Sequence, residues 1–412
     1  MSTKSSARPR IALVAIAAGI AALVAPTAAS AGVPDGQVKV MTRNVYLGAD
    51  LSPALSAPDQ GSLAVATTGI YNNVKYTDIN ARAKLVAKEI AKAKPDLVGL
   101  QEVAQYREDT IDEHIDENGD APGDPLNNVQ DGPFTPATTV TYDWRAALMT
   151  ELKKAKAKYR IVNIQREADI EVPATDRDKR LIMRDMILAR KGAGVTTQDE
   201  DQGHYDHLLE VAAAGGALNV TVNRGWLFTE ANVRGTQFRF LDTHLEAFGD
   251  NDQPGPQLRA AQAAELVQAG VPVNPQPGPA TYQSAGGTVV AVGDFNSDDD
   301  TVSGDDPLAY QALTTSANPP SNALTELSDE TTGGMSCCFE SEVIDEDPAT
   351  ALPQIDHHID KVFTNNAAVT EVETEIVGDT RRVHTESAGF GPRDLWASDH
   401  MGVVTTLQFP TP

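Results

Sequence analysis

The stretch Gly293-Asp294-Phe295-Asn296-Ser297 decides how this chain is interpreted. The segment before it, Thr288-Val289-Val290-Ala291-Val292, is apolar and largely β-branched, so it predicts a fully buried strand. Asp298-Asp299-Asp300 follows, and three successive carboxylates cannot continue such a strand. Asp294 and Asn296, two residues apart, therefore leave the end of a core strand on the same side. Strand ends are rigid and present their last side chains to solvent, which suits a catalytic pair.

Alone, Asp-x-Asn at the end of a strand is more typical of a turn. The interpretation changes because other predicted strands also end in polar side chains. Val38 to Val45 alternates like a strand and ends near Asn44, which either caps the next turn or positions a metal or a phosphate. Leu97 to Val103 is apolar but carries Glu102 near its end. A buried Glu is costly unless it is paired, so both a salt bridge and a metal ligand remain open.

Three later segments share this character. Residues 237–246 are predicted to form the second strand of a hairpin, residues 355–363 alternate like a strand, and residues 397–402 lead into a last strand at 403–409. Their polar residues are Asp242 and His244, then Asp356, His358 and Asp360, and finally Asp399 and His400. A single His at such a position is more often a satisfied core residue, so the set as a whole carries the functional interpretation.

Hydrophobic spacing places the remaining elements. It predicts helices over residues 78–94, 144–158, 259–266 and 306–313, and strands over 159–164 and 180–190. Residues 46–78 are rich in Ala, Ser, Pro, Gly and Asn and are predicted to form a long loop. His204 and His207 have a spacing that could suit a metal, but two histidines in a polar segment usually have no such role.

The two cysteines of the chain, Cys337 and Cys338, are adjacent. They cannot tie distant segments together, so we expect either a local bridge or two packed thiols. A catalytic thiol would need a partnering base, and the neighbouring sequence offers none.

Residues 1–31 have the pattern of a secretory signal peptide: basic residues at 4, 8 and 10, an apolar run at 11–24 and the small-residue site Ala29-Ser30-Ala31. The alternative, a retained membrane anchor, is disfavoured because the run is short and no other segment is long and apolar enough to span a membrane. Cleavage would remove three positive charges and no negative ones, which takes the net charge from -25 to -28. We therefore expect a secreted protein.

This acidity argues against tight, non-specific binding to nucleic acid, which depends on Lys and Arg that neutralise phosphates. It does not exclude turnover of a phosphate ester when a divalent cation masks the local charge. The polar set contains a Glu for a hard cation such as Mg²⁺, which prefers one or two carboxylates with water and substrate phosphate. Neighbouring Asp and His residues suit proton transfer, and without a paired Ser or Cys nucleophile direct attack by water is favoured.

These segments, taken together and in this order, resemble the endonuclease/exonuclease/phosphatase superfamily of metal-dependent phosphoesterases. The resembling segments are Met-Thr-Arg-Asn44-Val, Leu-Gln-Glu102-Val, Asp242-Thr-His244-Leu-Glu, Gly-Asp294-Phe-Asn296-Ser, Ile-Asp360-Lys-Val-Phe and Ser-Asp399-His400. The resemblance implies an α/β fold, a four-layer α/β sandwich with two facing mixed β-sheets flanked by helices. It implies one domain over residues 38–409, with insertions near 46–78, 104–140 and 191–235.

The resemblance also implies roles, residue by residue. Glu102 would bind Mg²⁺ (or Mn²⁺ or Ca²⁺), with Asn44 and Asp399 nearby. Asp294 and His400 would orient and deprotonate the attacking water. Asn296 and His244, with Asn44, would hold the substrate phosphate, and His244 would be placed to protonate the leaving oxygen. Asp360 would orient His244, and Asp356 is the alternative for the Asp360 position.

The predicted function is a secreted, metal-dependent phosphodiesterase of nuclease-like type that acts as a monomer, with no membrane span after removal of the signal. Asn44-Val-Tyr-Leu and Thr-His244-Leu-Glu-Ala resemble bacterial sphingomyelinases, so a phospholipase C activity is the first alternative and the substrate is either nucleic acid or a phospholipid head group. A catalytically inactive secreted binding protein on the same fold is the second.

Overall fold

The computed structural model describes residues 35–110, 137–216, 218–248, 255–267, 287–299, 306–315, 323–328, 334–339, 343, 352–379, 382–386 and 389–410. Residues 35–412 form one compact unit. The expected signal peptide, residues 1–31, lies outside the described residues, as does the 111–136 part of the predicted insertion at 104–140. Within the described part of the chain, no helix is long and apolar enough to cross a membrane.

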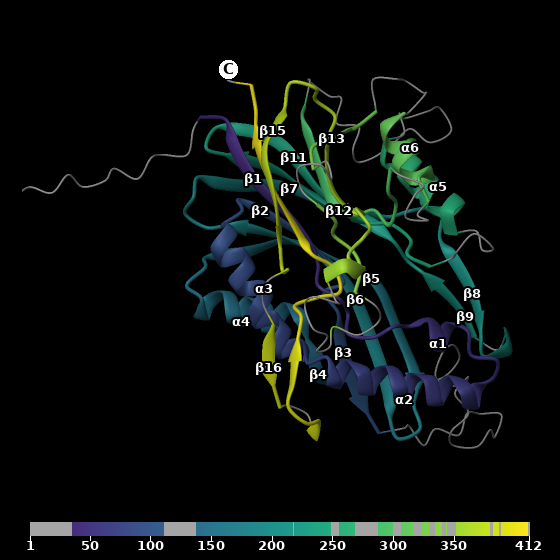
Figure 1. Cartoon of the computed structure of the whole chain (residues 1–412). Coiled ribbons are helices and arrows are strands. Elements are labelled where there is room, and N and C mark those ends of the chain that lie inside the picture. Colours follow the sequence, from purple (N-terminus) through teal and green to yellow (C-terminus); the bar gives the residue numbers. More distant parts are fainter. Residues whose placement is uncertain are drawn as a thin grey trace, which may run out of the picture. The chain divides into compact units, whose positions relative to one another are not determined.

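Two mixed sheets form the centre of this unit (Figure 1). The first has the order β15-β18-β1-β2-β6-β3-β4, with β5 paired to β6, and the second has the order β13-β14-β12-β11-β10-β7. The strands of the first are β1 (Gln37–Asn44), β2 (Leu97–Gln101), β3 (Gln105–Asp109), β4 (Thr139–Asp143), β5 (Tyr159–Pro173), β6 (Asp178–Arg190), β15 (Thr370–Val377) and β18 (Gly402–Gln408). Those of the second are β7 (Val195–His204), β10 (Gly225–Val233), β11 (Thr236–His244), β12 (Val289–Asp294), β13 (Thr325–Glu326) and β14 (Asp360–Thr364).

Helices cover the outer face of each sheet (Figure 1). The helices are α1 (Ser52–Leu55), α2 (Gln60–Tyr76), α3 (Ile79–Ala93), α4 (Trp144–Lys154), α5 (Gly255–Val267) and α6 (Leu308–Thr314), with 3-10 turns at η1 (Ala214–Gly216) and η3 (Leu352–Gln354). Two small ribbons, β8 (Leu209–Ala213) with β9 (Leu218–Val222) and β16 (Val383–Thr385) with β17 (Arg393–Leu395), lie outside the two sheets.

The layers follow from the alternation of side chains along the strands. In β12, Val290 and Val292 pack in the core between the two sheets, whereas Val289 and Ala291 pack with α5 and α6. On the other side, Met41 of β1 and Val98 of β2 pack with the buried residues of α3 and α4. The expected four-layer α/β sandwich with two facing mixed sheets is therefore confirmed.

The same alternation brings the polar strand ends together. In β12, Asp294 has the parity of Val290 and Val292, so its side chain points between the sheets. β12 pairs with β11 so that Asp294 lies opposite His244, and with β14 so that Asp294 lies opposite Asp360. In the facing sheet, Asn44 has the parity of the buried Val38 and Val40. One edge of the sandwich thus collects residues that are far apart in the sequence.

The prediction of a long loop at 46–78 is wrong, because most of this segment is helical in α1 and α2. Asp59 caps α2 by accepting a hydrogen bond from the Ser62 amide (N–O 2.7 Å), and Leu63, Ile70 and Val74 lie on its buried face. Small and polar residues between these positions hide the helical period in the sequence. The polar segment after Lys191 is likewise not a solvated loop, since β7 joins the second sheet by pairing with β10.

Gly99 in β2 shows how closely the two sheets approach each other. A Cβ atom at this position would lie 2.5 Å from Asp242 Oδ1 and 2.6 Å from Val292 Cγ2, and both groups belong to the facing sheet. We therefore expect Gly99→Ala to lower the free energy of unfolding by about 1–3 kcal/mol, the usual cost of overpacking. Denaturant unfolding of the variant tests this expectation. Gly192→Ala is the control for steric crowding, because a Cβ atom there meets nothing within 4 Å. Its positive φ of 74° adds only a small backbone cost. Equal unfolding midpoints for Gly99→Ala and the parent protein would contradict the close approach.

Candidate active site

Six of the predicted site residues meet at this edge of the sandwich. They come from β1, the end of β2, β11, β12, β14 and the segment before β18, and they are Asn44, Glu102, His244, Asp294, Asp360 and His400. All except Glu102 are buried, and Glu102 is half-buried at the edge. Direct contacts link these residues in the fold, although they lie far apart in the sequence.

Asn44 connects the two halves of the site. Its Nδ2 donates hydrogen bonds to Glu102 Oε1 (3.1 Å) and to Asp294 Oδ2 (3.0 Å). The Asn44 carbonyl accepts a bond from Ser398, and its Oδ1 accepts one from the Tyr46 amide, so the side chain is fixed from several directions. Glu102 also accepts a bond from the Leu47 amide (2.7 Å) and has φ of 61°, a conformation that turns the chain out of β2.

Asp360 orients His400, not His244. His400 Nδ1 lies 2.9 Å from Asp360 Oδ2, and its Nε2 lies 3.7 Å from Asp294 Oδ2. The predicted pairing of Asp360 with His244 is therefore wrong. The alternative placement of Asp356 at this position is also not seen, since Asp356 is exposed and precedes the start of β14.

Burial alone would lower the pKa of His400, but the nearby carboxylates of Asp360 and Asp294 outweigh it and hold that pKa well above its usual value. These carboxylates therefore favour the protonated imidazole. A protonated imidazole with Nδ1 bonded to Asp360 is suited to donate to anions.

His244 has the opposite character. Burial, followed by the positive charge of Arg224, holds the pKa of His244 well below its usual value. Arg224 Nη1 lies 3.1 Å from His244 Nδ1, and His244 Nε2 lies 3.5 Å from Asp294 Oδ2. These surroundings favour the neutral imidazole, whose single N–H is a much weaker acid toward a leaving oxygen than an imidazolium would be.

Asn296 and Asp399 complete the predicted set. The Asn296 amide donates to Asp294 Oδ1 (3.0 Å), and its side-chain Nδ2 donates to the Leu245 carbonyl (3.1 Å). Its φ of 48° lies in the left-handed region that Asn tolerates. Asp399 is half-exposed and lines the same cleft as Glu102. Asn296 therefore holds the Asp294 carboxylate in place, and Asp399 faces the opening.

The buried carboxylates carry raised pKa values. Burial raises the pKa of Asp294 to about 7, with Asp360 adding to the effect, and burial likewise raises the pKa of Asp185 to about 7. Burial also raises the pKa of Glu102, and the negative charge of Asp399 raises it further. Several acidic groups thus lie close together, and the negative charge of one makes ionisation of the next less favourable. Such raised pKa values are typical of functional sites.

A divalent metal fits this set of donors. Glu102 and Asp399 are like charges on one cleft, and a hard cation between them would relieve the repulsion that raises the pKa of Glu102. Mg²⁺ characteristically uses one or two carboxylates and completes its shell with water and substrate. Among the described residues, Asp294, Asp360 and His400 also place one ligand atom each within 4.8 Å of one another.

The cleft itself has a volume of about 180 Å³. Its lining combines the charged residues Glu102, Asp399 and Arg224 with apolar residues that include Leu51, Ile170 and Met183. The cleft thus offers two carboxylates, a buried arginine and an apolar surface to one ligand.

Sequence reasoning missed three groups in this site. Arg224 precedes β10 in no recognisable pattern, yet it is buried between His244 and Glu246. Asp185 lies inside the apolar run of β6 and accepts a bond from the Glu102 amide (3.1 Å). Cys337 Sγ lies 3.5 Å from His400 Nε2. Only the buried charge of Asp185 left a signal in the sequence, as a single carboxylate within an otherwise apolar strand.

The fold and site define a class of protein, an α/β sandwich whose one edge carries a cleft lined by Glu102 and Asp399 together with a buried cluster of aspartates and histidines. The sequence model of the Endonuclease/Exonuclease/phosphatase family matches residues 44–400, so this chain belongs to that family. Members of this family are hydrolases that act on phosphate esters and generally depend on a divalent metal. A comparison with curated proteins found no relative by sequence.

Three different proteins illustrate the solved structures that are similar to this chain. An endonuclease/exonuclease/phosphatase family protein from Bacteroides thetaiotaomicron is 12% identical, with 91% of this chain and 98% of that chain covered and a TM-score of 0.49. A mannosyl-6-phosphatase from the same organism is 14% identical, with 90% and 100% covered and a TM-score of 0.47. D. rerio TDP2 complexed with single strand DNA product is 14% identical, with 90% and 99% covered and a TM-score of 0.44.

Asp185 gives a prediction about stability and pH. Its pKa of about 7 in the folded protein lies above the unfolded value of about 3.9, so the folded state binds more protons between these values. This group therefore costs stability as the pH rises from about 4 to about 7. Asp185→Asn removes the titration and keeps an oxygen that can accept the Glu102 amide. With chelator present, we expect Asp185→Asn to melt at a higher temperature than the parent protein. This difference should grow as the pH rises from about 4 to about 7.

Asp201→Asn is the control for this experiment, because Asp201 is exposed on β7. Its melting temperature should follow that of the parent protein at each pH. A difference between Asp185→Asn and the parent that stays constant from pH 4 to 7, or that shrinks, would contradict a raised pKa at Asp185.

Proposed function

We propose that this protein is a secreted, divalent-metal-dependent phosphodiesterase that hydrolyses a phosphate ester by attack of water, with a nuclease-like site. The observation that supports it most directly is the Asn44 amide, which bonds Glu102 on one side and Asp294 on the other. This one side chain couples the carboxylate that suits a metal to the carboxylate that suits a base. Proton transfer and charge stabilisation can therefore act on the same phosphate.

Asp294 is the general base in this proposal. Its pKa of about 7 matches the operating range of a base at neutral pH. Asn44 and the Asn296 amide fix its two oxygens, so the lone pairs that remain have defined directions. His400 was expected to share this role, but as a cation bonded to Asp360 it is better suited to donate to a phosphate oxygen.

Arg224 and His244 form the other side of the phosphate site. The guanidinium is buried, and its pKa is raised because Glu246 and other nearby carboxylates outweigh the effect of burial. Arg224 therefore stays charged beside the neutral His244 and can neutralise a phosphate oxygen. A bound Mg²⁺, Mn²⁺ or Ca²⁺, held by Glu102 and Asp399 with Asn44 nearby, would polarise the phosphoryl group and offset its charge.

Purified protein incubated with Mg²⁺ and three substrates tests the proposal. Plasmid DNA, sphingomyelin and a phosphomonoester represent the nuclease, phospholipase and phosphatase activities. We expect cleavage of at least one phosphodiester, and loss of that cleavage with chelator. Activity on the monoester alone would replace the phosphodiesterase with a phosphatase, and no cleavage of any substrate would favour the inactive binding protein.

The sphingomyelinase-like phospholipase C is retained as a second candidate because of a specific observation. The apolar wall of the cleft offers contacts that a nucleotide does not need, and it includes Leu51, Ile170 and Met183. Hydrolysis of sphingomyelin in the same three-substrate assay distinguishes this candidate from the nuclease.

Export and oligomeric state belong to the same proposal. The basic start and small-residue site of residues 1–31 support cleavage and secretion, and N-terminal sequencing of protein from culture medium would test both. A mature N-terminus near residue 32 is the expected result. A monomer is expected in light scattering of the same material, and a stable dimer would contradict that part of the proposal.

A further inference from the structure

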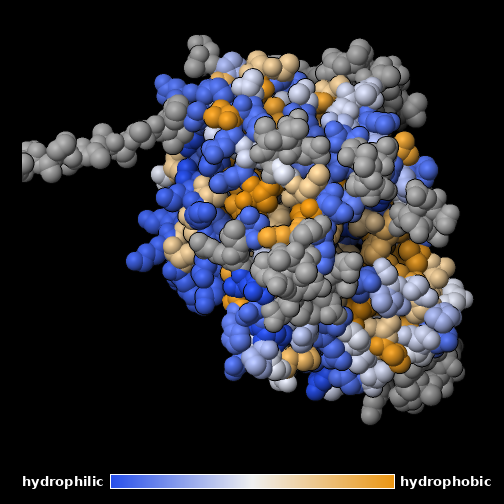
Figure 2. Space-filling model, viewed as in Figure 1, coloured by the Kyte–Doolittle hydropathy of each residue, from blue (hydrophilic) through white to orange (hydrophobic). Residues whose placement is uncertain are grey.

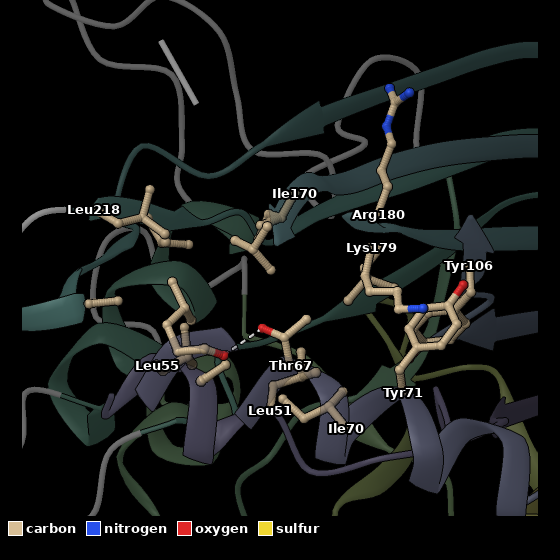
Figure 3. A pocket seen from close by; sticks show the side chains of 16 residues that line it. Leu51, Leu55, Thr67, Ile70, Tyr71, Tyr106, Ile170, Lys179, Arg180 and Leu218 are labelled. Atoms are coloured by element: carbon tan, nitrogen blue, oxygen red, sulfur yellow. Dashed lines mark hydrogen bonds between the residues drawn. The ribbon is translucent and has the colours of Figure 1, made fainter. Parts of the chain in front are cut away.

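An apolar cavity lies beside the catalytic cleft, between helices α1 and α2 and the strands that face them (Figure 3). It has a volume of about 90 Å³. Its labelled lining includes Leu55, Ile70, Ile170 and Leu218, whose side chains converge on the same space. Figure 2 shows apolar residues gathered on the side of the molecule where α1, β8 and β9 lie in Figure 1.

Most polar side chains of the lining are already engaged, and the exception is Tyr106, whose hydroxyl has no hydrogen-bond partner among the described residues. The Thr67 hydroxyl donates to the Leu63 carbonyl (2.8 Å) within α2. Lys179 Nζ bonds Glu108 (3.0 Å) and lies 4.4 Å from the centre of the Tyr71 ring, so its charge is paired. The cavity therefore offers little to a sugar, a base or ordered water, and empty apolar cavities of this order of size take up apolar ligands.

The cavity and the cleft adjoin each other. Five residues line both, and they are Leu51, Leu55, Ile170, Leu181 and Val220. The lining of the cleft also includes Glu102, Asp399 and Arg224. A molecule with a phosphate at one end and an alkyl chain at the other could therefore place the phosphate against these charged groups and its chain in the cavity.

We propose that this cavity binds the first methylenes of an alkyl or acyl chain, so that the site acts on phosphodiesters with an apolar chain, as in a phospholipid. This inference rests on the proposed hydrolytic function for its choice of substrate. The cavity itself is a binding site for the chain whether or not turnover follows. A polynucleotide, whose backbone is polar and charged throughout, gains nothing from it.

A series of 4-nitrophenyl alkyl phosphodiesters, from methyl to octyl and below their micellar concentrations, tests the proposal with Mg²⁺ present. Each methylene that becomes buried is expected to lower KM about fourfold until the cavity is full. Ala54→Phe fills the cavity from α1 and should flatten this dependence, with little change in kcat for the methyl ester. Val65→Phe is the matched control, because Val65 is 64% exposed on α2 and adds the same ring outside the cavity.

The outcomes separate the cavity from the hydrolysis. Turnover with a KM that does not depend on chain length would overturn the cavity and leave the hydrolase intact. Calorimetry with octylphosphonate and methylphosphonate needs no turnover, and tighter binding of the octyl compound, lost in Ala54→Phe, supports the cavity even if no ester is cleaved. Equal affinities would overturn it. If Ala54→Phe does not fold, the dependence of KM on chain length in the parent protein decides whether the cavity binds the chain.

A second inference rests on a different observation, the position of Cys337 and Cys338 beside His400. Their sulfur atoms lie 3.5 Å and 3.9 Å from His400 Nε2, and the three atoms lie within 4.8 Å of one another. The two sulfurs are bridged in the structure. Cys337 is fully buried, whereas Cys338 is half-buried and gives a reductant access to the bridge.

We infer that reduction of this bridge creates a Zn²⁺ site made of Cys337, Cys338 and His400. A dithiol supplies two electrons and two protons, the S–S bond breaks, and the dithiol is oxidised to its own disulfide. Zn²⁺ then displaces the two thiol protons, because two thiolates and an imidazole are ligands that this ion prefers. Zn²⁺ on His400 Nε2 would occupy the nitrogen that lies 3.7 Å from Asp294 Oδ2, so this nitrogen could no longer donate to a phosphate and hydrolysis would be inhibited.

Cobalt provides a test that does not depend on activity. Co²⁺ added to dithiol-treated protein, after removal of the dithiol, should give the absorption band of thiolate-to-cobalt charge transfer, and Zn²⁺ should abolish the band. Oxidised protein and Cys338→Ser are expected to lack the band or to show it much more weakly. No band in the reduced protein, or an undiminished band in Cys338→Ser, would overturn the inference. In a hydrolysis assay, Zn²⁺ should inhibit the reduced protein at least about tenfold more strongly than the oxidised protein.

Discussion

Replacing Asp294 with asparagine is expected to lower kcat by about 10²- to 10⁴-fold, the range typical of a lost general base. Asparagine has nearly the shape of aspartate, and its one oxygen can accept one of the two hydrogen bonds that Asn44 and the Asn296 amide donate to different oxygens of Asp294. The variant therefore keeps the shape of the side chain, gives up one of these bonds and loses the group that takes a proton. KM should change much less than kcat, because Asp294 acts on the water rather than on the substrate.

Asp299→Asn is the matched control for this experiment, since Asp299 is an exposed carboxylate five residues further along the same stretch. It should retain the activity of the parent protein. Melting temperatures of both variants establish that each is folded. A folded Asp294→Asn variant that keeps more than about a tenth of the parent kcat would contradict the role of Asp294 as base.

The second large effect is expected at Glu102. Glu102→Gln removes the charge that a cation would bind, while its one oxygen can still accept one of the two bonds that Asn44 and the Leu47 amide donate to Glu102. Residues that only support metal ligands cost about 10- to 100-fold in metal affinity, so the loss of a direct ligand should reach at least the upper end of that range. Calorimetric titration with Mg²⁺ measures the affinity, and the Mg²⁺ dependence of hydrolysis gives an independent midpoint.

Glu200→Gln serves as the control here, because Glu200 is an exposed carboxylate on β7, outside the cleft. Its Mg²⁺ affinity should equal that of the parent protein. If Glu102→Gln and Glu200→Gln gave the same midpoint, Glu102 would not be a metal ligand.

Much of the fold could be predicted from the sequence because strand alternation is a local signal. The parity that makes Val290 and Val292 face the core also makes Asp294 face it, and the same holds for Val40 and Asn44. Six short segments in a fixed order were enough to indicate the family, and the family model confirms it over residues 44–400.

The parts that the sequence did not predict depend on contacts across the fold. α2 has too many small and polar residues for its period to stand out, and packing of Leu63, Ile70 and Val74 is what stabilises it. The partner of Asp360 could not be chosen either. His244 and His400 both lie near strand ends, and only the antiparallel pairing of β12 with β14, together with the chain entering β18, places His400 within 2.9 Å of it.

Arg224 illustrates a further limit. A single arginine before a strand has no periodic or motif signal, and its role depends on neighbours from other segments, which are the buried His244 and Glu246 and the half-buried Glu102. Buried charges of this kind become visible only when the fold shows which charges face one another.

Hydrolysis of bis(4-nitrophenyl) phosphate by chelator-treated protein, as Mg²⁺ is added back, tests whether these residues form one metal-dependent phosphoesterase site. We expect no turnover in chelator and a saturable return of activity with Mg²⁺. Turnover that persists unchanged in chelator, or no turnover with Mg²⁺, Mn²⁺ or Ca²⁺ at any concentration, would contradict this expectation.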